Sequence, residues 1–341
     1  MHTPVQIQTD FPLKTLNTFG IDVTARAYLA VHSVRELQAV YHDRLLAGMP
    51  RLILGGGSNL LFMRDFPGLV LHMCMKDKSA SFDEDHILVT AAAGENWHEF
   101  VLWTLDNGWG GLENLAFIPG TVGAAPIQNI GAYGAEVKDF ILSLRVFDFC
   151  TGKVHHFTND DCQFAYRDSF FRQHGNGRHV IIDVTFRLAR AWKPNLSFGE
   201  VADSLASEGK TTPSPGEIAQ AIIAIRERKL PDPALSGNAG SFFKNPTVPE
   251  PFFRELKAMH PGVPGFRQPD GSFRVAAGWL IDQCGWRGKT AGNVGVHAHQ
   301  ALVLINTGEA SPDEVVAVAK AIRRDVLDRF GMELDTEPVF V

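Results

Sequence analysis

The pattern of apolar and polar residues predicts short strands mixed with a few helices. Every second residue of 180–188 is apolar, which is the period of a strand with one buried face. Residues 51–60 begin as a short buried strand and run into a triple-glycine turn, and residues 69–73 and 87–94 continue as short strands. Residues 145–158 are typical of a hairpin that turns at a Thr-Gly pair.

Helices are predicted where a capping residue precedes apolar residues at helical spacing. Residues 96–108 start at an Asn N-cap and stop at Asn-Gly, and capping boxes at 214–217 and 311–314 open two further helices, the second of which ends at Gly331. Residues 191–217 are polar and rich in Pro, Gly and Ser, which favours a mobile loop or a connection between domains. The elements lack a regular βαβ rhythm, so the pattern predicts an α+β fold.

Composition narrows the class of protein. The 341 residues carry 32 Lys and Arg against 38 Asp and Glu, a net charge of −6, with 45% hydrophobic and 21% charged residues. These values are ordinary for globular proteins and exclude a disordered chain, a coiled coil and a collagen-like repeat. The length predicts two or three domains. The mild acidity gives no general attraction to nucleic acid or anionic membranes, and neither is expected as a partner.

The cysteines and the start of the chain indicate the compartment. Four cysteines stand far apart without a CxxC pair, which argues against a disulfide framework and a cysteine-rich zinc site. The first residues do not follow the basic-then-apolar pattern of a secretory leader, and no run approaches 18 apolar residues. We therefore expect a soluble, cytoplasmic protein. His297 and His299 are more typical of a loop than of a metal site, and no metal is expected.

Glycine and proline are slightly in excess and gather in clusters. The chain has 32 glycines and 19 prolines, together about 15% of its residues against roughly 12% on average. The first cluster, Gly55–Asn59, lacks the third glycine of a dinucleotide-binding motif, and Pro67-Gly68 follows too soon for a long helix. Its backbone N–H groups form either an anion-binding nest or a plain tight turn, and the sequence alone leaves both open.

Two further clusters carry candidate chemistry. Residues 118–134 hold so many glycines, prolines and small residues that close contact of the backbone with a large flat ligand is favoured over a simple turn. Residues 237–246 combine Ser, Lys and Asn with glycines and a Phe pair. They form either an ordinary polar loop or a site in which Ser241 is a positioned hydroxyl donor, since no His stands nearby to make Ser241 a nucleophile.

Six segments taken in order resemble one known family. They are NTFG at 17–20, LILGGGSNLLF at 52–62, IPGTVGAAPIQNIGAYG at 118–134, YRDSFF at 166–171, GNAGSFFKNP at 237–246 and AAGWLIDQCG at 276–285. The set is similar to the UDP-N-acetylenolpyruvoylglucosamine reductases and covers nearly the whole chain. Each segment alone is a modest signal, whereas the ordered set is highly specific.

The resemblance implies a fold and a division of the chain. The expected fold is α+β, with an FAD-binding fold of the vanillyl-alcohol oxidase type and a separate α+β substrate-binding domain. The expected parts are residues 1–75 with 331–341 and residues 76–228, which bind FAD, and residues 229–330, which bind substrate. The second part includes the mobile loop 191–217.

The resemblance also implies an activity. Non-covalently bound FAD and NADPH as co-substrate would reduce UDP-N-acetylglucosamine enolpyruvate to UDP-N-acetylmuramate. This reaction supplies peptidoglycan precursors, on which cell wall biogenesis, cell shape and cell division depend. An FAD-dependent oxidase of the same fold, and a sugar-nucleotide-binding protein without redox chemistry, remain the alternatives.

The resemblance also implies roles for individual residues, at the positions where this sequence matches the family's segments. The resemblance implies that FAD is held by Gly55, Gly56, Gly57, Ser58, Asn59, Ile118, Pro119, Gly120, Gly123, Ile127, Gly131 and Tyr133. It implies that Tyr166, Lys229, Asn245 and Gln300 bind the sugar nucleotide, Lys229 and Asn245 at its diphosphate. Arg167 would meet the charge that develops on the substrate carboxylate, Ser241 would donate the proton and Glu337 would assist.

The chain departs from the family pattern in two places. In the mobile loop it has Phe198 where members usually place a Tyr that closes over the diphosphate. Near the end, Thr336-Glu337-Pro338 replaces a Pro-Glu-Val pattern, so Asp335 remains an alternative to Glu337.

Overall fold

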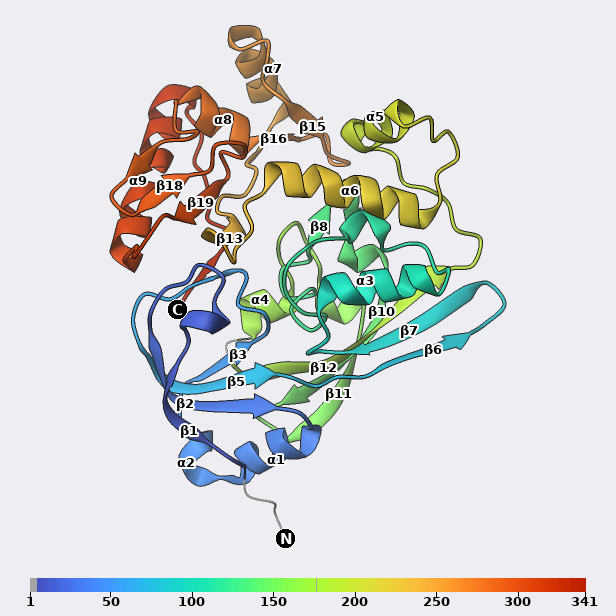
Figure 1. Cartoon of the computed structure of the whole chain (residues 1–341), viewed down its shortest axis with the longest axis vertical. Helices are drawn as coiled ribbons and strands as arrows, with labels where there is room; N and C mark the ends of the chain where they lie inside the picture. The colour runs from blue at the N-terminus through green and yellow to red at the C-terminus, as the bar shows by residue number, and fades with distance from the viewer. Residues whose placement is uncertain (1–4, 176) are drawn as a thin grey trace. The chain divides into compact units, whose positions relative to one another are not determined.

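The chain folds into two compact units. The computed structural model describes residues 5–175 and 177–341 (Figure 1). The first unit consists of residues 1–12, 24–57 and 66–226, and the second unit of residues 13–23, 58–65 and 227–341. The three-part division implied by the resemblance stays a prediction.

The first unit begins with a four-stranded sheet. Its order is β1-β2-β5-β3, in which β2, β5 and β3 are parallel and β1 is antiparallel to β2. The strands are β1 (Gln8–Pro12), β2 (Thr24–Val31), β3 (Arg51–Leu54) and β5 (Phe66–Met73), and two helices, α1 (Val34–His42) and α2 (Arg44–Ala47), follow β2 in the chain. The apolar run of β5 is buried because β5 lies between two other strands of this sheet.

A five-stranded antiparallel sheet forms the other part of the first unit. Its order is β11-β10-β12-β7-β6. The strands are β6 (Lys78–Phe82), β7 (His86–Ala92), β10 (Ile141–Asp148), β11 (Lys153–Thr158) and β12 (His179–Ala189). The hairpin predicted at 145–158 is confirmed as β10 and β11. Strand β12 is buried on both faces over residues 180–184, more than the one-face alternation predicted, because it lies in the middle of the sheet.

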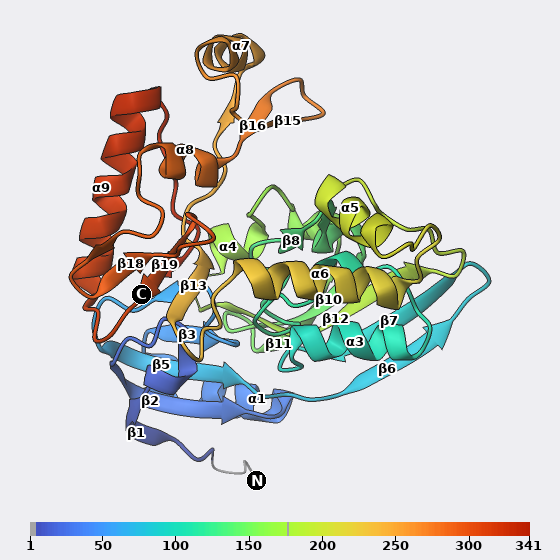
Figure 2. The ribbon, with the colours of Figure 1, turned by 45° about the horizontal axis from the view of Figure 1, so that its top comes forward.

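Helices cover parts of the first unit. Helix α3 (Trp97–Asp106) lies against the five-stranded sheet in both views and packs Trp97 and Phe100 onto Phe186 of β12 (Figures 1 and 2). The Asn96 side chain accepts from the Glu99 N–H at 3.0 Å, as the predicted N-cap requires. The remaining strands and α-helices of this unit are β8 (Gly131–Ala132), β9 (Ala135–Glu136), α4 (Phe170–His174), α5 (Gly199–Ser207) and α6 (Pro215–Lys229), the last three residues of which belong to the second unit.

Helix α5 lies inside the segment predicted as a loop. Its Val201 and Leu205 pack with Ile218 and Ile222 of α6 in a small separate core, and the two helices lie side by side in both views (Figures 1 and 2). The capping box at the start of α6 is confirmed, because Ser214 Oγ accepts from the Glu217 N–H at 3.3 Å.

The second unit has three small sheets. Their orders are β13-β19-β18-β17, β14-β16-β15 and β20-β4. The elements are β4 (Leu60–Leu61), β13 (Gly237–Ser241), β14 (Thr247–Val248), α7 (Glu250–Met259), β15 (Gly265–Arg267), β16 (Phe273–Val275), α8 (Ala277–Gln283), β17 (Thr290–Ala291), β18 (Val294–Val296), β19 (Val303–Asn306), α9 (Pro312–Phe330) and β20 (Val339–Phe340). Helix α9 starts at the predicted capping box of Ser311 and ends at Gly331 in the left-handed conformation.

No helix among residues 5–175 and 177–341 is both long and apolar enough to cross a membrane.

Candidate active site

The first two glycine clusters meet inside the first unit. A Cβ atom placed on Gly56 would lie 2.9 Å from the Cα of Gly120, and one placed on Gly55 would lie 2.6 Å from the Thr121 hydroxyl. A Cβ atom placed on Gly123 would lie 2.5 Å from the Ala93 Cβ. Only glycine permits such close backbone approach. The turn at 55–57 and the run at 118–134 therefore form one continuous backbone surface.

The run at 118–134 contains unusual backbone conformations. Asn129 and Tyr133 have φ values of +44° and +47°, and Phe117, just before the run, has +59°. These values lie in the left-handed region, which costs a residue with a Cβ atom about 1–2 kcal/mol. Such strain gathers at functional sites, where the surrounding structure holds it in place.

Buried side chains hold this strained backbone. Asn129 is fully buried, and its Nδ2 donates to Glu136 Oε2 and to the Ala165 carbonyl, each at 3.0 Å. Ser169 Oγ donates to the Ile127 carbonyl at 2.6 Å. Asn114 Nδ2 donates to the Tyr133 carbonyl at 2.8 Å. The conformation of the run is thus fixed by residues outside it.

A buried hydroxyl lies where the two glycine clusters meet. Thr121 Oγ1 is inaccessible to solvent and has no hydrogen-bond partner among the described residues. A buried polar atom without a partner costs about 1–3 kcal/mol, which a bound ligand with a donor or acceptor removes. The glycine surface and this hydroxyl together fit a flat, phosphate-bearing group.

Arg167 is held on a tight turn of the first unit. The backbones of Ala165 and Asp168 exchange hydrogen bonds at 3.1 and 3.2 Å, and Arg167 between them has φ of +53°. Its Nη2 donates to the Gly131 carbonyl at 2.9 Å, and its guanidinium lies 5.3 Å from the centre of the Tyr166 ring. The turn therefore brings Arg167 and Tyr166 to the run at 118–134.

A second arginine lies near Arg167 and was not predicted. Arg226 Nε donates to the Phe117 carbonyl at 3.0 Å. The pKa of Arg226 lies below its ordinary value, chiefly because the guanidinium is buried. The charge of Arg167 lowers this pKa further, whereas the interaction with Tyr133 opposes the shift. The signal in the sequence is the position of Arg226 four residues after Ile222, on the buried face of α6. A charged residue at such a position indicates a role beyond packing.

The loop at 191–217 packs on the same run within the first unit. The ring of Phe198 meets the ring of Tyr133 edge to face, with centroids 5.2 Å apart. Asn195 Nδ2 donates to the Gly134 carbonyl at 3.0 Å, and Trp192 Nε1 donates to Glu113 Oε1 at 2.6 Å. The loop is therefore anchored at several points.

In the second unit, Ser241 and Glu337 lie on neighbouring segments. The Glu337 N–H donates to the Phe242 carbonyl at 2.9 Å, and Thr336 forms a bridge with Phe243. Glu337 is 8% exposed, whereas Asp335 is exposed. Residues 237–241 form β13, so the alternative interpretation of this region as an ordinary polar loop is wrong for these residues.

The remaining predicted residues of the second unit have local contacts. Asn59 Nδ2 donates to the Glu337 carbonyl at 3.3 Å. Asn245 Oδ1 accepts from the Ala277 N–H at 2.9 Å, at the start of α8. Gln300 Oε1 accepts from the Leu302 N–H at 3.3 Å. Ser58 precedes Asn59, and Lys229 is the last residue of α6.

The described residues show neither a cluster of metal-ligating side chains nor a disulfide. Within residues 5–175 and 177–341, His, Cys, Asp and Glu side chains form no group of three that could hold a metal ion. Cys74, Cys150, Cys162 and Cys284 are all free thiols.

Comparisons with known proteins point to one family. Residues 25–158 match the model of an FAD binding domain, and residues 232–341 match the C-terminal domain of UDP-N-acetylenolpyruvoylglucosamine reductase. The chain is 53% identical over 333 residues to the protein of that name from Paraburkholderia phymatum, covering 97% of this chain and 96% of the relative. It is 50% identical over 338 residues to the one from Burkholderia pseudomallei, covering 98% and 97%.

A solved structure shares the fold. It is the reductase from Thermus caldophilus, which is similar with a TM-score of 0.66 and 22% identity, covering 99% of this chain and 98% of that one.

Proposed function

The chain belongs to the UDP-N-acetylenolpyruvoylglucosamine reductase family, and from this premise we propose how its own residues carry out the reaction. The protein is an FAD-dependent oxidoreductase that uses NADPH to reduce UDP-N-acetylglucosamine enolpyruvate to UDP-N-acetylmuramate in peptidoglycan precursor synthesis. Its fold is α+β, with an FAD-binding fold of the vanillyl-alcohol oxidase type and a separate C-terminal domain.

The two glycine clusters are proposed to hold FAD. The chemistry that bound FAD supplies is transfer of a hydride from NADPH to the outer carbon of the enolpyruvyl double bond. The residues proposed to contact it are Gly55, Gly56, Gly57, Ser58, Asn59, Ile118, Pro119, Gly120, Gly123, Ile127, Gly131 and Tyr133. The close approach of Gly56 to Gly120 and the buried Thr121 hydroxyl support this proposal.

Arg167 is proposed to stabilise the charge that develops on the substrate. When the outer carbon gains hydride, negative charge builds on the inner carbon and spreads into the carboxylate. A guanidinium matches a carboxylate with two parallel hydrogen bonds. The contacts of Arg167 with the Gly131 carbonyl and the Tyr166 ring support a fixed orientation of the guanidinium.

Ser241 is proposed to give its hydroxyl proton to the inner carbon. The new C–H bond completes the reduction, and the serine oxygen then recovers a proton from water. A hydroxyl is a weak acid, but the carbanion is a strong base, so the transfer is feasible when geometry is held. Glu337 is proposed to assist this step, and its burial beside the segment that follows Ser241 supports Glu337 over the exposed Asp335.

The sugar nucleotide is proposed to contact Tyr166, Lys229, Asn245 and Gln300, with Lys229 and Asn245 at the diphosphate. An ammonium group and an amide N–H suit phosphate oxygens. Asn245 Oδ1 already accepts from Ala277, so its Nδ2 would be the group that faces the ligand.

We also infer a cytoplasmic location. The four free thiols support a reducing compartment.

The observation that carries the proposal is the identity of 53% over 97% of the chain. The test mixes the purified protein with NADPH and the enolpyruvyl sugar nucleotide and follows the loss of NADPH absorbance. We expect a yellow protein that consumes NADPH in proportion to substrate. A colourless protein that FAD does not reconstitute, or turnover with oxygen and not with this substrate, would overturn the proposal.

A further inference from the structure

A β-bulge sets the direction of the Ser241 side chain. In the pairing of β13 with β19, Asn238 lies opposite Ile305 and Ser241 lies opposite Val303. Two residues of β13, Ala239 and Gly240, therefore face a single residue of β19. Asn238 and Ser241 consequently share one face of the sheet although they are three residues apart. A regular strand would turn Ser241 to the opposite face.

The side chain of Asn238 holds this bulge. Its Oδ1 accepts from the Gly240 N–H at 3.0 Å, and its Nδ2 donates to the Ser236 carbonyl at 2.9 Å. Gly240 has φ of +68°, a conformation that the hydrogen bond from its N–H helps to fix. Asn238 is 4% exposed, and loss of these bonds leaves partly buried backbone groups of Ser236 and Gly240 without this partner.

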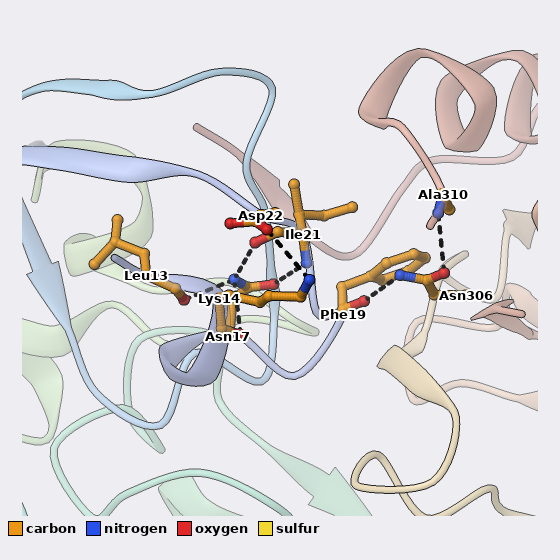
Figure 3. Close-up of polar contacts among 8 residues, drawn as sticks. All are labelled: Leu13, Lys14, Asn17, Phe19, Ile21, Asp22, Asn306 and Ala310. Atoms are coloured by element: carbon orange, nitrogen blue, oxygen red, sulfur yellow. Dashed lines mark hydrogen bonds and ion pairs between the residues drawn. The ribbon is translucent and has the colours of Figure 1, made fainter. Parts of the chain in front are cut away.

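The loop at 17–20 in turn holds Asn238. Thr18 Oγ1 donates to the Asn238 carbonyl at 2.6 Å, and the Asn238 N–H donates to the Thr18 carbonyl at 2.9 Å. Asn17 Nδ2 bonds the Leu13 and Ile21 carbonyls at 2.9 and 3.0 Å, which closes the loop on itself (Figure 3).

A second contact joins this loop to β19. Asn306 Nδ2 donates to the Phe19 carbonyl at 3.0 Å, and Asn306 Oδ1 accepts from Ala310 at 3.1 Å (Figure 3). Asn306 also lies opposite Gly237, the first residue of β13. The loop is therefore fixed to both strands that form the bulge.

We propose that Asn238 is a positioning residue that aims the Ser241 hydroxyl through the Gly240 bulge, and that Thr18 fixes Asn238 for this task. The proposal rests on the role proposed above for Ser241 as proton donor. It assigns to residues 17–20, the first of the six segments that carry the family resemblance, a function in proton delivery rather than in ligand contact.

The test separates the two half-reactions by rapid mixing. Asn238→Ala should slow reoxidation of the reduced enzyme by the enolpyruvyl sugar nucleotide at least tenfold and raise its solvent deuterium isotope effect, because proton delivery becomes limiting. Flavin reduction by NADPH should stay within twofold. Thr18→Val, which keeps the shape and removes the hydroxyl, should act in the same direction, and Thr18→Ser should restore the rate.

A second readout does not depend on turnover. Amide hydrogen exchange at Gly240 and Ser241 of the holoenzyme should become faster in Asn238→Ala and in Thr18→Val, and return to the original rate in Thr18→Ser. Phe253→Leu is the control for a general loss of stability, because Phe253 stacks on Phe273 and lies outside β13 and the 17–20 loop. It should change neither readout.

The outcomes distinguish the two proposals. If Ser241→Ala leaves reoxidation unchanged, the role of Ser241 as proton donor is wrong. If Ser241→Ala slows reoxidation while Asn238→Ala does not, the donor role stands and the positioning role is wrong. Equal slowing of both half-reactions in Asn238→Ala, or exchange at Gly240 that stays at its original rate, would also overturn the positioning role.

Discussion

The rings of Tyr133 and Phe198 meet edge to face with centroids 5.2 Å apart. Tyr133 belongs to the run at 118–134 and Phe198 to the loop at 191–217, so this contact joins the loop to the proposed flavin site. The aromatic contact therefore helps to hold the loop on the run at 118–134.

Phe198→Ala should loosen the loop. An edge-to-face pair contributes about 0.5–1.5 kcal/mol, and the 36% exposure of Phe198 favours the lower half of that range. We expect limited proteolysis within residues 191–217 to accelerate about two- to fivefold and KM for the sugar nucleotide to rise. Phe198→Tyr keeps the ring and should leave the proteolysis rate unchanged. Equal proteolysis of Phe198→Ala and the original protein would contradict the anchoring role.

Ser241→Ala should separate the two halves of the reaction. Removal of a proton donor lowers the rate of the step that needs the proton by about 10²–10⁴-fold. Stopped-flow absorbance should show normal flavin reduction by NADPH and slow reoxidation by substrate. Reoxidation at the original rate would remove Ser241 from the mechanism.

Glu337→Gln compared with Asp335→Asn should identify the late carboxylate. Glu337 is 8% exposed and its N–H bonds the Phe242 carbonyl, whereas Asp335 is exposed. We expect Glu337→Gln to slow reoxidation by about 10²-fold and Asp335→Asn to change it less than twofold. The reverse result would assign the role to Asp335.

Elements set by local chemistry could be predicted from the sequence. The capping boxes of α6 and α9, the Asn96 cap of α3 and the β10–β11 hairpin depend on residues a few positions apart, and all are confirmed. Helix α5 and strand β13 could not be predicted. Helix α5 is stabilised by Val201 and Leu205 packing on α6, and β13 by pairing with β19. Such tertiary contacts override weak local propensity.

The candidate site could also be predicted only where its residues give a local signal in the sequence. The composition of the run at 118–134 favoured close contact of its backbone with a ligand, but the sequence did not indicate that Gly56 and Gly120 approach each other. Polar residues that act on distant backbone carried no local signal. Asn238 is one such residue, because its carbonyl bonds Thr18, 220 positions away.

Gly56→Ala should disturb the glycine surface. The added Cβ would lie 2.9 Å from the Gly120 Cα, so the run at 118–134 must shift. Overpacking of this kind costs about 1–3 kcal/mol. We expect less FAD per protein, measured as the ratio of flavin to protein absorbance, and a lower melting temperature.

Gly216→Ala is the matched control for that change. Gly216 lies in α6, and its added Cβ has no neighbour within 4 Å. Flavin content should stay unchanged and stability should be equal or slightly higher, since alanine favours helix. Full flavin content in Gly56→Ala would contradict the proposed cradle.

Asp148→Asn should reduce stability in a pH-dependent way. The carboxylate of Asp148 is buried and accepts from Arg178 Nε and from the Cys150 N–H, each at 2.9 Å. Chiefly because of the bond from Arg178, its pKa is lowered to about 2. Because the folded pKa lies below the unfolded value of 3.8, the stabilisation is complete above about pH 4 and is lost as the pH falls toward 2.

Urea unfolding at pH 7 should show a loss on the order of 2 kcal/mol in the variant, and the difference from the original protein should shrink between pH 4 and 2. Asp22→Asn, which breaks an exposed pair with Lys14, is the control and should change stability by less than about 1 kcal/mol at either pH. A difference for Asp148→Asn that stays constant from pH 7 to pH 2 would show that the ion pair is not its source.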